Sequence, residues 1–147
     1  MNLLVTGGCG FIGSNFIEMV LQTKRPWIKK IVNLDVLTYA GSLENTLDFE
    51  TDEKYIFEKV DLCEYEDVLD VFDRHDITHV IHFAAESHVD NSIADPDAFI
   101  DSNIGGTFNL LKASRCHKVK KFHHVSTDEV YGDLGDDGKF SETTPYN

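Results

Sequence analysis

LVTGGCGFIGSNF, residues 4–16, connects a short apolar run to a stretch with helical periodicity through a glycine-rich turn. The glycines satisfy G-x-G-x-x-G at Gly8, Gly10 and Gly13, and G-x-x-G-x-x-G at Gly7, Gly10 and Gly13. Glycine permits a tight turn and positive φ, and it lets a diphosphate approach the backbone. The helix behind the turn offers unpaired N–H groups and a partial positive charge. The segment therefore predicts a strand, a turn and a helix that can hold an anion.

A carboxylate in the next predicted strand supports a ligand at this turn. The spacing alone is also compatible with a tight glycine turn that binds nothing. Asp35 closes the second strand 22 residues after Gly13, where it can accept hydrogen bonds from an adenosine ribose. A solvated strand end is the other interpretation of Asp35. Strand, turn, helix and carboxylate together predict a dinucleotide site.

Apolar runs alternate with segments of helical periodicity along the rest of the chain. We expect strands at 2–6, 31–35, 55–60, 79–85 and 121–126, and helices at 11–22, 64–74 and from Asp95-Pro96 onward. Asp95 can cap this last helix, and Pro96 suits its first position. The order predicts an α/β fold, a doubly wound, Rossmann-like parallel sheet with helices on both faces.

The periodic positions predict the buried face of each helix. The expected core positions are Ile12, Phe16, Met19 and Val20 in the first helix, Tyr65, Val68, Leu69 and Phe72 in the second, and Ile100, Ile104, Phe108 and Leu111 in the third. A loop is predicted after Tyr131, at Gly132, Gly135, Asp136, Asp137 and Gly138.

Composition limits the size and the partners of the protein. The 147 residues suit one domain, 1–147. With 13 Lys and Arg against 26 Asp and Glu, the formal net charge is −13, so we expect no nucleic-acid partner. No apolar run approaches the roughly 20 residues of a membrane-spanning helix, so we expect no membrane partner. Three cysteines without paired spacing are typical of free thiols in a reducing cytoplasm.

Four segments carry a family resemblance that covers the whole chain. They are the glycine segment quoted above, LDVLTYAGSLENT (34–46), HFAAESHVDNSI (82–93) and HHVSTDEVYGD (123–133). With them the sequence resembles the N-terminal part of the dTDP-glucose 4,6-dehydratases, extended short-chain dehydrogenases/reductases that act on nucleotide sugars. The resemblance implies NAD as cofactor and dTDP-glucose as substrate. It also implies oxidation at C4, loss of water across C5–C6 and return of the hydride to C6.

The resemblance also implies roles for Thr127-Asp128-Glu129. Elimination needs a base for the C5 proton and an acid for the departing 6-hydroxyl, which two carboxyl groups on one loop can supply. By resemblance Asp128 is the acid, Glu129 the base and Thr127 a hydrogen-bond partner of the sugar near C4. The other interpretation is a solvated turn in an acid-rich chain.

Further cofactor positions follow from the same resemblance. It implies a diphosphate along Gly7, Gly10, Phe11, Ile12 and Gly13, adenosine along Asp35, Val36, Leu37 and Thr38, adenine at Asp61 and Leu62, and nicotinamide beside Phe83, Ala84, Ala85, Glu86 and Ser87. Ser87 is also implied to touch substrate, and Ser102 stands where a Thr is frequent. Val36 and Asn91 depart from the family, which often has Lys and Arg there.

The histidines and Cys9 do not predict a metal site or a nucleophile. His123 and His124 would point to opposite faces of a strand, so they cannot chelate one ion. The positions 75, 79 and 82 lack the spacing of a zinc site. Cys9, between two glycines, is interpreted as a small filler of the turn.

Short-chain dehydrogenases use a Tyr-x-x-x-Lys pair as the base that oxidises the alcohol. Neither Tyr131 nor Tyr146 is followed by Lys four residues later, so we expect this pair to be missing. We therefore expect a sheet truncated after about five strands, without the C-terminal substrate lobe and inactive alone. The complete enzyme is expected to be a homo-oligomer. A catalytically dead dinucleotide-binding module, or a fragment of a nucleotide-sugar epimerase or decarboxylase, remains an alternative, although Asp128-Glu129 disfavours the latter.

We predict that the chain prefers NAD to NADP. The Asp35 carboxylate would repel a 2′-phosphate, and no Arg follows it to accept that group. Calorimetric titration with both cofactors measures this preference. Equal or tighter binding of NADP would contradict the role given to Asp35.

Overall fold

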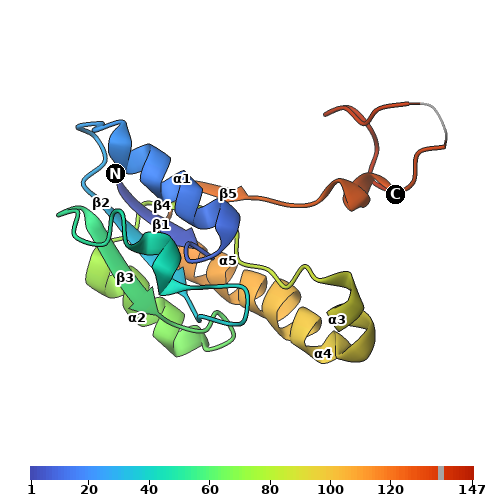
Figure 1. Cartoon of the computed structure of the whole chain (residues 1–147), viewed down its shortest axis with the longest axis horizontal. Coiled ribbons are helices and arrows are strands. Elements are labelled where there is room, and N and C mark those ends of the chain that lie inside the picture. Colours follow the sequence, from blue (N-terminus) through green and yellow to red (C-terminus); the bar gives the residue numbers. More distant parts are fainter. Residues whose placement is uncertain (136–137) are drawn as a thin grey trace.

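Five parallel strands form the centre of the computed structural model, which describes residues 1–135 and 138–147. The strands are β1 (Asn2–Thr6), β2 (Lys30–Asp35), β3 (Tyr55–Lys59), β4 (His79–His82) and β5 (Lys121–His124). Their order is β3-β2-β1-β4-β5, and every neighbouring pair is parallel (Figure 1). This order confirms the predicted doubly wound sheet, in which the chain leaves β1 in one direction and later returns to its other side.

Helices cover both faces of the sheet, as predicted. The α-helices are α1 (Phe11–Gln22), α2 (Tyr65–His75), α3 (Val89–Ala94), α4 (Pro96–Phe99) and α5 (Thr107–Cys116). The 3-10 helices η1 (Leu43–Thr46) and η3 (Asp128–Tyr131) and the π-helix η2 (Ile100–Gly106) complete the described elements. The helix α1 lies on one face, and α2 and α5 pack together on the other (Figure 1). The separate short helix α3 was not predicted.

The two core layers follow from the alternation of side chains along each strand. On β1, Leu4 joins α2 and α5 in one apolar cluster, whereas Leu3 and Val5 join Ile17 of α1 in the other. Successive strand residues point to opposite faces, so a central strand buried on both faces is apolar throughout. The nearly continuous apolar character of β1 and β2 is explained by this position.

The predicted buried face of α1 was partly wrong. Ile12 and Met19 are 61% and 55% exposed. The residues that α1 buries are Gly13, Ser14 and Ile17, with Phe16 and Val20 half-buried beside them. The small residues at the first turn let the helix approach the sheet closely, and this rotates Ile12 and Met19 toward solvent.

The buried face predicted for the third helix was wrong. Ile100, Ile104, Phe108 and Leu111 are 54%, 62%, 64% and 47% exposed. The core instead receives Gly106, Leu110, Ala113 and Ser114. Three of these four residues are small, and a Cβ on Gly106 would lie 2.8 Å from the Cβ of Leu62. The helix lies so close to its neighbours that mainly small residues fit between them, and the large apolar side chains face outward.

The start of this helical region partly matches expectation. Pro96 occupies the first turn of α4 and Asp95 precedes it, but the Asp95 side chain makes no capping hydrogen bond. The predicted loop after Tyr131 has no regular structure at Gly132–Gly135 and at Gly138, and the positions 136 and 137 lie outside the described residues.

Across the described ranges no helix is both long and apolar enough to cross a membrane.

A buried histidine connects the sheet to the start of α5. The His82 ring bonds the Thr6 hydroxyl through Nδ1 at 2.6 Å and the Thr107 hydroxyl through Nε2 at 2.9 Å. Burial, with a smaller contribution from the nearby His124, lowers the pKa of His82 to about 4. The folded chain therefore keeps this ring neutral at pH values where the unfolded chain protonates it.

We predict that His82 makes the fold less stable in mild acid. Below pH about 6.5 the unfolded state binds a proton that the folded state excludes, so stability falls as the pH falls toward 4. Between pH 7 and pH 5 the free energy of unfolding should fall by about 2 kcal/mol more in wild type than in His82→Gln. Urea unfolding at both pH values measures this difference.

The exposed His123 provides the matched control. His123→Gln should keep the wild-type loss of stability between pH 7 and pH 5. An equal loss in His82→Gln and wild type would show that His82 does not cause the effect.

Candidate functional site

Three glycines of the first turn are required by the packing of the backbone. A Cβ on Gly7, where φ is +70°, would lie 2.7 Å from the Ala84 nitrogen. A Cβ on Gly8 would lie 2.1 Å from Asn33 Oδ1, and one on Gly13 would lie 2.2 Å from the Gly7 carbonyl oxygen. The turn is therefore pressed against the end of β4, the middle of β2 and its own backbone.

Gly10 differs from the other three glycines because a Cβ there would meet no severe contact. The nearest atom to a Cβ built there is the Gly7 carbonyl oxygen at 3.4 Å. Gly10 is the N-cap of α1, and no side chain caps this end of the helix. The first N–H groups of a helix have no partner within it. An uncapped helix end with a cradle that a methyl group would fill fits an anion such as a diphosphate.

The carboxylate of Asp35 fixes the glycine loop against β2. It is buried, and its Oδ2 accepts the Cys9 N–H at 2.9 Å while its Oδ1 accepts the Leu37 N–H at 2.8 Å. The Cys9 carbonyl accepts a further bond from the Ser42 N–H at 3.1 Å and one from Asn45 Nδ2 at 2.8 Å. The sequence interpretation missed Ser42 and Asn45, because a backbone N–H or a side chain that bonds a distant backbone leaves no local pattern.

The surroundings of Cys9 agree with its interpretation as a filler of the turn. Its thiol is buried and accepts a hydrogen bond from Asn33 Nδ2 at 3.3 Å. Burial, together with the nearby Asp35 charge, raises the pKa of Cys9 to about 11. The sulfur is therefore a neutral thiol at physiological pH, which makes it a poor nucleophile.

The residues implied for adenosine and adenine lie at or just after the ends of β2 and β3. Val36 and Thr38 are exposed, and Leu37 is half-buried with a positive φ of 61°. Asp61 is exposed and its Oδ1 accepts the Cys63 N–H at 2.9 Å. The Leu62 side chain is buried in the core, and its carbonyl oxygen accepts Asn109 Nδ2 of α5 at 2.9 Å.

The residues implied for nicotinamide form the loop after β4. Phe83 packs on Phe16 with ring centroids 5.4 Å apart, and Ala84 follows against Gly7, whereas Ala85 and Ser87 are exposed. Glu86 is held by a residue that the sequence interpretation missed. Asn103 in η2 accepts the Glu86 N–H and donates to the Glu86 carbonyl, both at 2.8 Å. Ser102, half-buried, precedes Asn103 in the same π-helix, which places it near this loop.

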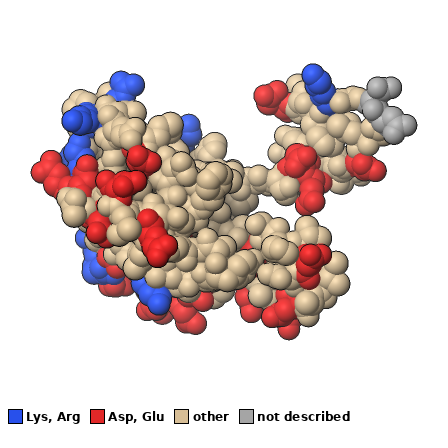
Figure 2. All heavy atoms as spheres, in the orientation of Figure 1, with Lys and Arg blue, Asp and Glu red and all other residues tan. Residues whose placement is uncertain are grey.

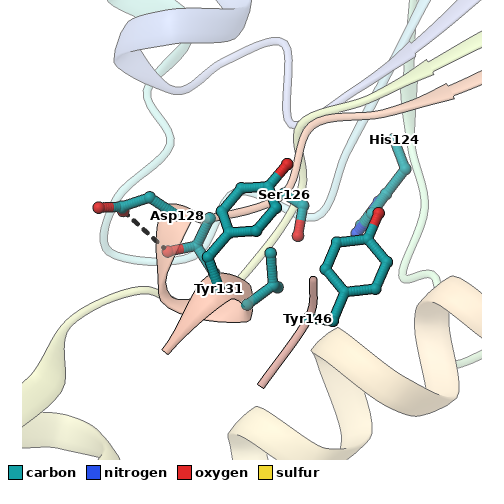
Figure 3. Close-up of a pocket in the computed structure, with 7 residues that line it drawn as sticks. His124, Ser126, Asp128, Tyr131 and Tyr146 are labelled. Atoms are coloured by element: carbon teal, nitrogen blue, oxygen red, sulfur yellow. Dashed lines mark hydrogen bonds between the residues drawn. The ribbon is translucent and has the colours of Figure 1, made fainter. Parts of the chain in front are cut away.

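Thr127, Asp128 and Glu129 form the start of the short helix η3. Thr127 is its N-cap, accepting the Glu129 N–H at 3.3 Å and donating to Asp128 Oδ1 at 3.5 Å. Thr127 and Asp128 line a hollow of about 790 Å³ (Figure 3). Its other lining residues are His124, Ser126, Val130, Tyr131 and Tyr146. Glu129 is exposed and does not line the hollow.

The carboxylates of η3 and the glycine cradle lie in separate parts of the molecule. Both follow carboxyl ends of parallel strands, but the chain after β5 extends away from the sheet (Figure 1). No hydrogen bond among the described residues joins Thr127–Tyr131 to the glycine loop. Figure 2 shows acidic side chains on the segment after β5 and on the part of the molecule that faces it across an open gap.

The expectation that Tyr-x-x-x-Lys is missing was wrong as a statement about spacing. Tyr55 and Lys59 have this spacing, but they lie in β3 and not in a helix. A strand separates positions i and i+4 by roughly 13 Å, whereas a helix brings them together. The Tyr55 hydroxyl instead accepts Asn33 Nδ2 at 2.9 Å, and Lys59 is exposed. The pair therefore cannot act as a tyrosine base with an adjacent cation.

The histidines of β5 point to opposite faces, as their neighbouring positions predict. His124 lines the hollow beside Asp128, whereas His123 lines an apolar hollow beside Phe16 and Phe83 on the face that carries α1. Within residues 1–135 and 138–147, no three His, Cys, Asp or Glu side chains gather as metal ligands would.

Comparison with known proteins gives a consistent set of relatives. The profile of a family described as GDP-mannose 4,6 dehydratase matches residues 4–147. The chain is 48% identical to a dTDP-glucose 4,6-dehydratase of Neisseria gonorrhoeae, over 99% of this chain and 44% of that protein. It is 48% identical to a protein of the same name from Mycolicibacterium smegmatis, over 100% of this chain and 43% of that one.

Solved structures with a similar fold include a protein of the same name as the sequence relatives. DesIV, a dTDP-glucose 4,6-dehydratase from Streptomyces venezuelae crystallised with NAD, matches with a TM-score of 0.92 and 39% identity, over 100% of this chain and 45% of that one. A UDP-glucose 4-epimerase of Thermus thermophilus in complex with NAD matches with a TM-score of 0.86 and 35% identity, over 100% and 44%. The chain thus spans less than half the length of each of these proteins.

We predict that an added methyl group lowers stability at Gly13 and weakens NAD binding at Gly10. Gly13→Ala places Cβ against the Gly7 carbonyl and should lower the free energy of unfolding by about 1–3 kcal/mol. Gly10→Ala has room and an ordinary backbone conformation, so its stability should stay within about 1 kcal/mol of wild type. The same methyl fills the cradle and should weaken NAD binding about tenfold or more.

Urea unfolding and calorimetric titration measure the two effects separately. Gly135, which has no neighbour within 4 Å of a built Cβ, provides the control substitution to Ala. NAD binding by Gly10→Ala with wild-type affinity would contradict the assignment of the cradle.

Proposed function

The chain belongs to the GDP-mannose 4,6 dehydratase family, and on that basis we propose that it forms the NAD-binding part of a dTDP-glucose 4,6-dehydratase. The observation that supports this function is the Thr127-Asp128-Glu129 turn, which follows the carboxyl end of β5 as the glycine cradle follows that of β1. Two of the dehydratases compared above are 48% identical to the chain and the third, DesIV, is 39% identical, against 35% for the epimerase. These identities favour the dehydratase over the epimerase alternative.

We propose that the ends of β1, β2, β3 and β4 hold the dinucleotide. The first N–H groups of α1, beside Gly10, would hold the diphosphate, and Phe11 and Ile12, both exposed at this end, would flank it. Asp35 would accept a ribose hydroxyl with the lone pairs that its two backbone bonds leave free. Bound NAD supplies a hydride acceptor and donor for the sugar. The loop at 83–87 would face the nicotinamide.

This arrangement explains how a strongly acidic chain would hold an anionic cofactor. With a net charge of −13, the chain cannot rely on its overall field to attract a diphosphate. Backbone N–H groups and the dipole of α1 act only over a short range, where they outweigh distant charges. The Asp35 carboxylate is already engaged by two backbone donors, which spread its negative charge.

The two carboxyl groups of η3 would carry the elimination. Asp128, in the hollow, would hold the proton that the departing 6-hydroxyl takes, and Glu129 would accept the C5 proton. Thr127 fixes the turn that separates them, because its hydroxyl bonds both the Glu129 N–H and the Asp128 carboxylate. Consecutive residues on one 3-10 turn point in different directions, as an acid and a base on different atoms of one sugar require.

One role in this reaction is not filled by the residues described above. C4 oxidation needs a base for the 4-hydroxyl proton, and the Tyr55–Lys59 spacing in β3 cannot supply it. We therefore propose that the chain alone does not turn over dTDP-glucose and that a Tyr-Lys pair on another segment completes the site. We also propose a homo-oligomer for the complete enzyme, which the outward apolar stripe of η2 and α5 would suit.

We predict different failures for two substitutions in η3. The test protein joins this chain to the remaining half of the Neisseria gonorrhoeae relative, so that the reaction can run. Glu129→Gln removes the C5 base but not C4 oxidation, so NADH should accumulate and C5 exchange with deuterated water should largely vanish. Asp128→Asn keeps the base, so C5 exchange should persist while water loss slows by roughly 10²–10⁴-fold.

Three readouts separate the outcomes: NADH absorbance, C5 deuterium incorporation and release of the 4-keto-6-deoxy product. Loss of exchange in Asp128→Asn, with retention in Glu129→Gln, would reverse the two roles. Normal turnover in both variants would leave η3 as a solvated turn and contradict the proposed function.

A further inference from the structure

Two loops flank the glycine turn because of the strand order. The strands β2 and β4 lie on either side of β1, so residues 36–42 and 83–88 leave the sheet on opposite sides of the turn at Gly7–Gly10. The first loop belongs to the adenosine side of the proposed site and the second to the nicotinamide side. A bond between them would fix the spacing of the two loops on either side of the proposed dinucleotide site.

Each loop is separately tied to a rigid part of the fold. The first is held at its far end, where the Ser42 N–H donates to the Cys9 carbonyl at 3.1 Å. The second is held by Asn103, whose amide makes two 2.8 Å bonds with the backbone of Glu86. Between Leu37 and Gly41, however, the first loop has an exposed crest at Thr38, Tyr39 and Ala40.

One side-chain hydrogen bond connects this crest with the opposite loop. The Tyr39 hydroxyl donates to Glu86 Oε2 at 3.1 Å, although the two residues are 47 positions apart. Among the hydrogen bonds of the described residues, this is the one that joins 36–42 directly to 83–88. The Tyr39 side chain is 66% exposed, so little packing holds it there apart from this bond.

We infer that Tyr39 is a positioning residue of the dinucleotide site, acting through Glu86. The inference rests on the proposed function, because it concerns the proposed NAD site. Asn103 fixes the Glu86 backbone, and the Glu86 carboxylate then anchors the crest of the opposite loop. A ligand that contacts both loops meets them at a preset spacing and loses less freedom on binding. A ligand that contacts only the adenosine side does not depend on the bridge.

The first test needs no ligand. Tyr39→Phe removes the hydroxyl and keeps the ring, so amide hydrogen exchange at 36–42 and 83–88 should accelerate about 2- to 10-fold, the effect expected for one hydrogen bond. Glu86→Gln retains an oxygen that accepts the hydroxyl and should stay near wild type. Tyr65→Phe is the matched control, because the Tyr65 hydroxyl lies on α2 at 3.9 Å from the Cys116 sulfur.

The second test compares NAD with AMP by calorimetric titration. In Tyr39→Phe the Kd of NAD should rise about 2- to 10-fold, and the Kd of AMP should stay unchanged. An unchanged or lowered Kd of NAD in Tyr39→Phe would overturn the inference, and so would unchanged exchange at both loops. If wild type binds AMP and NAD with equal affinity, the proposed NAD function fails, and faster exchange in Tyr39→Phe would then support only the bridge.

Discussion

The buried carboxylate of Asp35 holds together the part of the molecule on which the site depends. It accepts N–H groups from Cys9 in the glycine loop and from Leu37 in the loop after β2, so one side chain joins the ends of β1 and β2. Backbone donors in a buried loop must be paired, and a carboxylate pairs two of them with strong bonds. Position 35 thereby determines the shape of the glycine cradle, in addition to any contact that it makes with a ribose.

The fold could be predicted from sequence because its signals are local. The glycine turn, the apolar strands and the order of elements follow from short patterns, and the parallel sheet follows from their order. The buried faces of α1 and α5 were less predictable. Periodicity identified the stripe of Ile100, Ile104, Phe108 and Leu111, but not the side of the helix that meets the sheet. Packing gave that side to Gly106, Ala113 and Ser114, which allow a shorter distance between helix and sheet than large side chains do.

The residues of the candidate site also differ in whether a local sequence pattern identifies them. Gly10 and Asp35 could be recognised because their spacing and strand context are confined to a few residues. Asn103, Asn45 and Ser42 could not, because each bonds the backbone of a loop far away in sequence. Tyr55 and Lys59 show the reverse error, since their spacing has chemical meaning only in a helix and they lie in a strand. A spacing motif therefore carries information only together with its secondary structure.

The π-helix η2 allows the two ends of one helical region to satisfy different neighbours. Its single wider turn has the effect of one extra residue, which rotates the preceding segment by about 100° relative to a continuous α-helix. Downstream of it, α5 is oriented by its small residues against α2; within η2 itself, Asn103 faces the loop after β4. A continuous α-helix would have to compromise between these two orientations. Deleting one residue from 100–106 would restore regular helical geometry and turn the Asn103 amide away from Glu86. The π-helix therefore sets the rotation of Asn103 relative to the face of α5 that packs in the core.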